Sequence, residues 1–278
     1  MISRVLQQKL LDFKQAMPIA TVTGPRQSGK TTLVKDTFPE YGYTNLERPN
    51  IRQMIQEDPI GFLATFDNKK GGIIDEAQYA PALFSYLQSL VDEQKQAKFV
   101  LTGSQNFLLS AQISQSLAGR VRILTLLPLS IQEIAASPHR LPNVASYIWK
   151  GGYPAVYKKG MDVQDWYLDY TQTYVERDVR QLINIHSLSQ FQIFLKLCAG
   201  RIGQVVNYTA LANEVGVKDT TIRQWINLLE ASYIMYTLKP YYKNFGKRLI
   251  KAPKIYFYDT GLACSLLDIK SPEQVEKH

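Results

Sequence analysis

The stretch 19–32, IATVTGPRQSGKTT, decides the fold, because an apolar run, a glycine-bounded loop and a helical pattern follow one another in it. Its first five residues alternate β-branched and small side chains, which predicts a buried strand that ends at Gly24. The spacing Gly24-x-x-x-x-Gly29-Lys30-Thr31 is that of a phosphate-binding loop between a strand and a helix. Glycines let backbone N–H groups face an oxyanion, and the helix N-terminus adds positive potential.

The residue types in this loop predict binding of ATP with Mg²⁺. We expect Lys30 to reach the β and γ phosphates and to act in catalysis, and the Thr31 hydroxyl to ligate Mg²⁺. The alternative is a chance glycine-rich turn before a helix, which the agreement of loop and flanks disfavours. The residues predicted to bind ATP are Gly24, Pro25, Arg26, Gln27, Ser28, Gly29, Lys30, Thr31 and Thr32.

Two carboxylates follow a second apolar run in the sequence IIDE at 73–76. This pattern predicts a buried parallel strand that places Asp75 and Glu76 at the carboxyl edge of a sheet, where ligands bind in open α/β folds. Asp75 is predicted to hold Mg²⁺ opposite Thr31, directly or through water. Glu76 is predicted to orient or deprotonate the water that attacks the γ-phosphate. In the alternative, both acids cap the following helix.

Two further residues are candidates for catalytic roles. Ser104 follows the predicted strand 98–101 and is expected either to sense the γ-phosphate or to cap a helix. Arg120 follows a predicted helix at 108–117 that Gly119 ends. It is expected to act as an arginine finger toward a neighbouring subunit, or else to be an ordinary surface or salt-bridged arginine.

Strands and helices alternate from residue 19 to about residue 130, which predicts an α/β fold with a parallel sheet and helices on both faces. Other strands are expected at 41–46 and 123–127, and another helix at 81–94. The N-terminal segment 1–17 predicts an amphipathic helix that turns Val5, Leu6, Leu10 and Phe13 inward.

The last third of the chain has a helix-turn-helix pattern. A helix at 208–216 and a second one to about 231, capped by Asp219 or Thr220, are followed by strands at 233–238 and 254–258. The second helix buries a face made of Ile222, Trp225, Ile226 and Leu229. Between the strands lies a basic stretch without acids, which predicts a hairpin wing facing nucleic acid; protein docking or dimerisation remains the alternative. The predicted nucleic-acid contacts are Lys218, Thr221, Arg223, Gln224, Lys243, Lys247 and Arg248.

Four segments carry a resemblance to a known family: GPRQSGKTT at 24–32, IIDEAQ at 73–78, LTGSQ at 101–105 and SLAGRV at 116–121. They resemble the AAA+ P-loop ATPases, of the additional-strand, catalytic-glutamate branch, found as uncharacterised ATP-binding proteins in bacteria and archaea. The resemblance implies a three-layer ATPase core, a winged helix and then a restriction-endonuclease-like domain, whose acid–lysine metal cluster this chain lacks. The expected domains are an ATPase core at 1–138, a helical lid or linker at 139–200, a winged helix at 201–262 and the start of a truncated region at 263–278.

Composition limits the other possibilities. The formal net charge is +8, and a local basic patch points to a polyanionic partner more directly than the overall charge does. The apolar runs are too short for a membrane span, and the two cysteines form no CxxC motif, so a cytoplasmic ATPase is expected.

Within a predicted helix at 166–185, Arg177 is either a second nucleotide sensor or part of a solvated charged face. The expected partners are ATP or ADP, duplex DNA and further copies of the chain, with a nucleotide-gated regulator or docking module of little turnover as the alternative.

Overall fold

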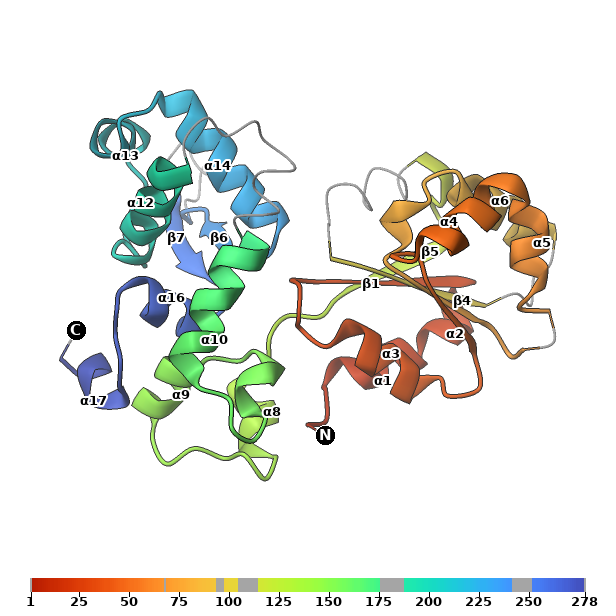
Figure 1. The fold of residues 1–278 in the computed structure, drawn as a ribbon, viewed down its shortest axis with the longest axis horizontal. Coiled ribbons are helices and arrows are strands. Elements are labelled where there is room, and N and C mark those ends of the chain that lie inside the picture. The colour runs from red at the N-terminus through yellow and green to blue at the C-terminus, as the bar shows by residue number, and fades with distance from the viewer. Residues whose placement is uncertain are drawn as a thin grey trace. The chain divides into compact units, whose positions relative to one another are not determined.

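The computed structural model describes residues 2–67, 69–93, 98–104, 115–175, 188–241 and 252–277 of the 278-residue chain. The chain divides into two compact units, Met1–Leu127 and Pro128–His278, and Figure 1 shows the elements of each. The finer division of the second unit into a lid, a winged helix and a further region stays a prediction.

A five-stranded sheet forms the centre of the first unit. Its strands are β1 (Ile19–Thr23), β2 (Gly42–Asn45), β3 (Gly72–Asp75), β4 (Phe99–Gly103) and β5 (Val121–Thr125). They lie in the order β2-β3-β4-β1-β5, and every neighbouring pair is parallel. The predicted α/β fold with a parallel sheet is therefore confirmed, although β5 begins two residues before the expected strand at 123–127.

Helices cover both faces of this sheet, as Figure 1 shows. On one face lie α1 (Leu6–Leu11), α2 (Phe13–Ala16) and α3 (Lys30–Thr37); on the other lie α4 (Pro49–Glu57), α5 (Pro59–Ala64) and α6 (Leu83–Glu93). Alternation along the strands explains the two apolar layers, because successive side chains point to opposite faces. Ile19 and Ile74 join the α4–α6 layer, whereas their neighbours Ala20 and Ile73 join the α1–α3 layer.

The N-terminal segment forms two short helices rather than one amphipathic helix. Leu10 and Phe13 are fully buried as predicted, and the Phe13 ring meets Phe38 of the region after α3 edge-to-face with centroids 5.8 Å apart. Leu6 is partly buried against the same layer. Val5 is 65% exposed, so its predicted inward position is wrong, because it precedes the first helical turn.

The second unit is mainly helical. The predicted helix at 166–185 is helical as far as it is described: α10 (Val163–Tyr170) begins three residues earlier and continues as a π-helical turn at Thr171–Val175. Residues 176–187, with the candidate sensor Arg177, lie outside the described residues. Its elements are α8 (Ile131–Ala135), α9 (Val144–Lys150), η2 (Pro154–Tyr157), α10 (Val163–Tyr170), α12 (Leu188–Ala199), α13 (Tyr208–Val215), α14 (Asp219–Ala231), β6 (Met235–Leu238), β7 (Lys254–Phe257), α16 (Thr260–Leu266) and α17 (Pro272–Val275).

The helix pair α13–α14 matches the sequence expectation closely. Gly216 ends α13 in the left-handed conformation, with φ of 76°. The predicted apolar face of α14 is buried throughout. The predicted cap is wrong, because the helix starts at Asp219, the first candidate cap, and Lys218 occupies the N-cap position. Strands β6 and β7 pair antiparallel, while the stretch 242–251 between them lies outside the described residues.

A buried carboxylate joins distant parts of the second unit. Asp259, at the start of α16, accepts hydrogen bonds from the backbone N–H groups of Leu262 (2.8 Å) and Gly152 (2.7 Å). Burial raises the pKa of Asp259, and these donors oppose that rise. Gly151 has φ of 68°, and a Cβ there would lie 2.2 Å from the Tyr167 hydroxyl. The GGYP turn at 151–154 is therefore packed against α10 and α16 as one structure.

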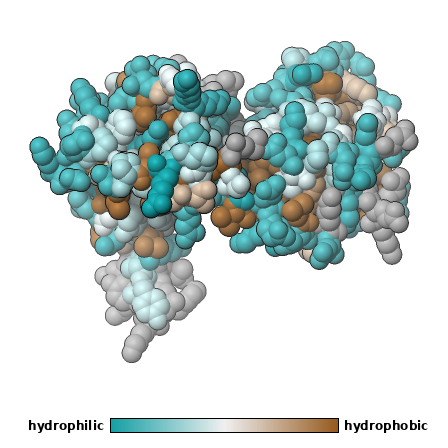
Figure 2. Space-filling model, turned by 90° about the horizontal axis from the view of Figure 1, so that it is seen from below, coloured by the Kyte–Doolittle hydropathy of each residue, from teal (hydrophilic) through white to brown (hydrophobic). Residues whose placement is uncertain are grey.

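Among the described residues, no helix is both long and apolar enough to cross a membrane. The face seen in Figure 2 is covered mostly by hydrophilic residues, with hydrophobic ones in small groups.

Candidate functional site

The predicted phosphate-binding loop connects β1 to α3, which begins at Lys30. Gly24 and Gly29 have φ values of 145° and 93°, which side chains rarely allow. At Gly24 a Cβ would also lie 2.1 Å from the carbonyl oxygen of Leu126. Both glycines are therefore required by the backbone itself, and the loop forms in the strand–loop–helix setting expected from the sequence.

The Lys30 ammonium group lies inside this loop. Its side chain is buried, and Nζ donates hydrogen bonds to the carbonyl oxygens of Gly24 (3.0 Å) and Pro25 (2.8 Å). A buried ammonium group needs such acceptors, because burial without them is costly. The loop carbonyls thus hold a positive charge at the N-terminus of α3, where the helix dipole also favours an anion.

Asp75, at the end of β3, accepts hydrogen bonds from hydroxyl groups on three different elements. Its Oδ2 accepts hydrogen bonds from Thr31 Oγ1 (2.8 Å) and from Tyr43 Oη (2.9 Å), and its Oδ1 accepts one from Thr102 Oγ1. Asp75 is buried, so these donors replace water around the carboxylate. Burial first, and then the charge of Asp75, raise the pKa of Tyr43 above its ordinary value.

The oxygen donors of Thr31 and Asp75 fit a magnesium ion. Mg²⁺ prefers octahedral oxygen ligands at about 2.1 Å, so two adjacent ligands lie about 3 Å apart. Thr31 Oγ1 and Asp75 Oδ2 are 2.8 Å apart. Protein-bound Mg²⁺ usually keeps several waters and is held by one or two carboxylates plus substrate phosphates, so phosphate and water would complete the coordination.

Glu76 lies one residue beyond β3 in a left-handed conformation, with φ of 56°. Its Oε2 accepts hydrogen bonds from Gln78 Nε2 (2.5 Å), Ser104 Oγ (3.2 Å) and the Ser104 N–H (3.4 Å). Its backbone N–H donates to Thr102 Oγ1 over 3.3 Å. Thr102 therefore links Glu76 to Asp75, and the Glu76 carboxylate is oriented through one of its two oxygens.

The structure brings Lys30, Thr31, Asp75, Glu76 and Ser104 to the carboxyl edge of the sheet. All follow or end strands β1, β3 or β4, which are neighbours in it. Ser104 contacts Glu76, and its alternative role as a helix cap stays a prediction because residues 105–114 lie outside the described residues.

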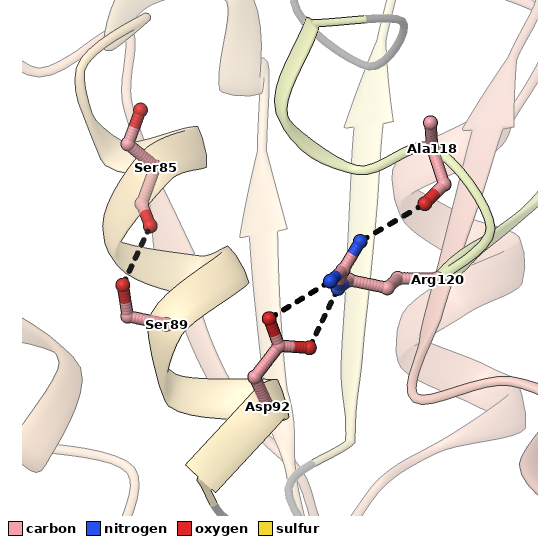
Figure 3. A network of polar contacts seen from close by, with 5 residues as sticks. All are labelled: Ser85, Ser89, Asp92, Ala118 and Arg120. Carbon is pink, nitrogen blue, oxygen red and sulfur yellow. Dashed lines mark hydrogen bonds and ion pairs between the residues drawn. The ribbon is translucent and has the colours of Figure 1, made fainter.

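Arg120 does not join this group. Its carbonyl accepts a hydrogen bond from the N–H of Ile19, at the start of β1, whereas the phosphate-binding loop follows the end of that strand. The Arg120 guanidinium donates through Nε (2.6 Å) and Nη2 (2.9 Å) to Asp92 at the end of α6, and through Nη1 to the Ala118 carbonyl (Figure 3). Within one chain, Arg120 thus lies in a surface ion pair at the opposite edge of the sheet.

The candidate nucleic-acid contacts fall partly inside the described residues. Lys218 and Gln224 are exposed on α14 or at its start, and Thr221 is half-buried. The Arg223 guanidinium lies 3.9 Å from the Tyr208 ring centroid and 3.8 Å from Asp219 Oδ2, so contacts within the helix pair orient it. Lys243, Lys247 and Arg248 lie outside the described residues.

Sequence reasoning missed three side chains at the site: Tyr43, Thr102 and Gln78. Tyr43 contacts Asp75 because β2 is the neighbour of β3, and strand order is a tertiary property. Thr102 is the last residue but one of β4, and Ser104 follows that strand, so their shared position at the strand end was an available signal. Gln78 follows Glu76 by two residues and contacts it where Glu76 has a left-handed backbone, which apolar periodicity does not predict.

Comparison with known proteins agrees with this geometry. Residues 16–135 match a family model described as "AAA domain", and residues 141–273 match one described as "Domain of unknown function (DUF8612)". An uncharacterized protein of Mycobacterium tuberculosis is 34% identical over 270 residues, which are 94% of this chain and 58% of that protein. The chain therefore spans little more than half the length of that relative.

Two further likenesses cover most of the chain. An uncharacterized protein of Haemophilus influenzae is 26% identical over 92% of this chain and 70% of its own length. A Walker-type ATPase of Pyrococcus abyssi has the same fold, with a TM-score of 0.64 over 96% of both chains at 14% identity. Residues 16–135, which match the AAA domain model, contain the parallel sheet and its loop, and the whole chain shares its fold with this ATPase.

Proposed function

We propose that this protein hydrolyses ATP to ADP and phosphate with Mg²⁺ at the carboxyl edge of the first unit's sheet. The observation that carries the proposal is the Thr31–Asp75 hydrogen bond, which puts the first turn of α3 beside the strand that ends at Glu76. A nucleotide-binding loop alone suits many classes of protein. A nucleotide-binding loop together with the carboxylates of Asp75 and Glu76 at the same edge of the sheet suits phosphoryl transfer to water.

Each residue has a distinct part in this reaction. Lys30 and the N–H groups of residues 24–32 bind the phosphates and compensate their charge. Thr31 and Asp75 hold Mg²⁺, which when bound neutralises charge on the phosphate oxygens. Glu76 takes the proton of the attacking water, and Ser104 orients its carboxylate. Such a reaction needs positioned groups more than covalent chemistry, which fits the dense hydrogen bonding around Asp75 and Glu76.

The test is the steady-state ATPase rate of the full chain, measured as a function of protein concentration with and without duplex DNA. Turnover that requires Mg²⁺ is expected. Turnover per chain that rises with concentration would indicate homo-oligomers and a finger in trans, for which Arg120 is the candidate. ATP binding without measurable turnover would replace the enzyme by a nucleotide-gated regulator. Lys30→Ala should weaken ATP binding itself, and unchanged affinity would contradict the assignment of the loop.

We also propose that the second unit contacts duplex DNA through a winged helix built on α13 and α14. The exposed polar side chains of α14 support this, since Lys218 and Gln224 have no role in the buried face of the helix. The order of α13, α14, β6 and β7 is that of a helix-turn-helix followed by a hairpin. In this proposal, ATP hydrolysis switches the conformation of the winged helix.

DNA binding measured against salt concentration tests this second proposal. Phosphate contacts make affinity fall steeply as salt rises. Removing Lys243, Lys247 and Arg248 together should flatten that dependence, while Gln224→Ala should leave the slope unchanged because glutamine carries no charge. An absence of binding at low salt would favour a docking or self-association surface.

A further inference from the structure

Arg4 belongs to none of the predicted motifs, yet its guanidinium contacts the phosphate-binding loop. Nη1 donates a hydrogen bond to the Ser28 carbonyl over 2.8 Å, and Nη2 donates one to the Leu127 carbonyl. These acceptors lie 24 and 123 positions away in the sequence. Ser28 is part of the loop, and Leu127 is the last residue of the first unit. One side chain thus joins the loop to the point where the chain leaves this unit.

The packing of the N-terminal helices delivers Arg4 to this place. Arg4 precedes α1, and its carbonyl accepts the Gln7 N–H over 3.0 Å in the turn that starts the helix. Leu10 and Phe13 then bury themselves in the apolar layer around α3, the helix that the loop opens. The backbone of Arg4 is therefore held at the start of α1, and α1 packs against α3, the helix that begins at the loop.

The contact with Ser28 has a defined effect on the loop backbone. In a trans peptide the C=O and the following N–H point in opposite directions. Holding the Ser28 carbonyl toward Arg4 therefore fixes the Gly29 N–H on the side away from Arg4. A planar guanidinium suits this task, because its fork of N–H groups holds two carbonyls at fixed angles.

Gly24, at the start of the loop, also lies against residues 126–127, where the chain leaves the first unit. Gly24 lies so close to Leu126 that a Cβ added at Gly24 would overlap the Leu126 carbonyl. The Leu126 N–H also donates a hydrogen bond to the Thr23 carbonyl over 2.8 Å. Residues 126–127 therefore contact the loop at both ends, directly at Gly24 and through Arg4 at Ser28. A Lys30 ammonium group that moves from the Gly24 and Pro25 carbonyls to a phosphate would change the hydrogen bonding of the first of these ends.

We propose that Arg4 is a positioning residue that couples the phosphate-binding loop to residues 126–127, so that nucleotide binding changes the chain where the second unit begins. The proposal rests on the ATP-binding function proposed above. Pro128 follows directly, and within the second unit the Leu129 N–H donates to the Gly152 carbonyl over 2.6 Å. A change at Leu127 is thus two residues from a hydrogen bond of the GGYP turn.

Amide hydrogen exchange with and without ATP and Mg²⁺ tests the coupling in the 278-residue chain. In the wild type we expect nucleotide to alter exchange in peptides covering 24–32 and also in peptides covering 124–131. Arg4→Ala should keep the nucleotide-dependent change in exchange at 24–32 and lose the change at 124–131. It should also bind a fluorescent ATP analogue about tenfold more weakly, as expected for the loss of the charge-assisted hydrogen bond to the Ser28 carbonyl. Arg4→Lys keeps the charge without the fork, so it should lose the response at 124–131 as well.

The controls separate this proposal from the proposed function. Arg140→Ala removes an exposed arginine of the second unit and should behave as the wild type. Circular dichroism identifies a misfolded Arg4→Ala, in which case Arg4→Lys carries the test. A wild type that does not bind the ATP analogue overturns the ATPase assignment before any variant is made. A wild type that binds it without a response at 124–131, or Arg4 variants that respond as the wild type does, overturn the coupling alone.

Discussion

The Tyr43 hydroxyl on β2 donates a hydrogen bond to Asp75 Oδ2 on β3 over 2.9 Å, and that same oxygen accepts one from Thr31. Tyr43 is itself held from outside, because the Lys35 ammonium group lies 4.4 Å from its ring centroid. The edge strand of the sheet therefore orients the carboxylate that we assign to Mg²⁺. Outer partners of this kind set the direction and the affinity of a metal ligand.

Tyr43→Phe should weaken the dependence on Mg²⁺ without preventing folding. It removes one hydroxyl and leaves Asp75 its bonds from Thr31 and Thr102. We expect the Mg²⁺ concentration for half-maximal ATP binding to rise about tenfold, as for other outer partners of metal ligands. A fluorescent ATP analogue titrated at several Mg²⁺ concentrations measures this. Tyr86→Phe, which alters a partly exposed tyrosine of α6, is the matched control. An unchanged Mg²⁺ requirement would contradict the outer role of Tyr43.

Glu76→Gln should abolish turnover while ATP binding is kept. The amide has nearly the shape of the carboxylate but cannot take a proton from water, and general base catalysis contributes about 100-fold or more. Single-turnover hydrolysis and binding of a fluorescent analogue separate the two effects. Undiminished hydrolysis would remove Glu76 from its role.

Gln78→Leu should lower kcat and leave ATP affinity within about twofold, because Gln78 contacts Glu76 and a lost hydrogen bond to a charged group affects the step that uses that group. Gln78 is buried, and its Oε1 has no hydrogen-bond partner among the described residues, so the apolar replacement leaves little else unsatisfied. The measurement is kcat and KM together with the melting temperature. A higher KM at unchanged kcat would mean that Gln78 acts on binding instead.

How far the sequence predicts this site depends on the range of each interaction. The loop at 24–32 and the pair Asp75–Glu76 are local patterns, and the structure has both at the carboxyl edge of one sheet, as expected. Tyr43 and Arg4 were not predictable, since their partners are fixed by strand order and by helix packing over tens of residues. The prediction that Val5 points inward was wrong for a local reason, because apolar periodicity does not show where a short helix begins.

The Arg120–Asp92 pair allows the finger hypothesis to be decided. Asp92→Asn and Arg120→Ala both break the ion pair, but only Arg120→Ala removes a guanidinium from a neighbour's site. If the pair is structural, both variants keep wild-type ATPase activity and lower the melting temperature by a similar, small amount. If Arg120 acts in trans, its variant alone loses kcat.

The pair also has a pH signature. The Arg120 hydrogen bonds lower the pKa of Asp92, so the pair's contribution is present above the ordinary carboxyl range and is lost as pH falls through the lowered value. Melting temperatures of wild type and Asp92→Asn should therefore converge in acid. If the two plots of melting temperature against pH stay parallel, the ionised Asp92 carboxylate adds nothing to stability.

Gly151→Ala should destabilise the second unit strongly, and Gly160→Ala supplies a matched control. Both glycines have positive φ, 68° and 79°, but Gly151 also has ψ of −166°, a region that essentially only glycine adopts, so alanine there costs about 1–3 kcal/mol in backbone strain alone. A Cβ at Gly160 meets nothing within 4 Å, whereas at Gly151 it would lie 2.2 Å from the Tyr167 hydroxyl and 2.6 Å from Asp259 Oδ1. Gly151→Ala must therefore displace a buried carboxylate with its hydrogen bonds, which adds roughly 2–3 kcal/mol. Thermal melts of the two variants measure the difference, and equal melting temperatures would mean that the GGYP turn can move away from Asp259.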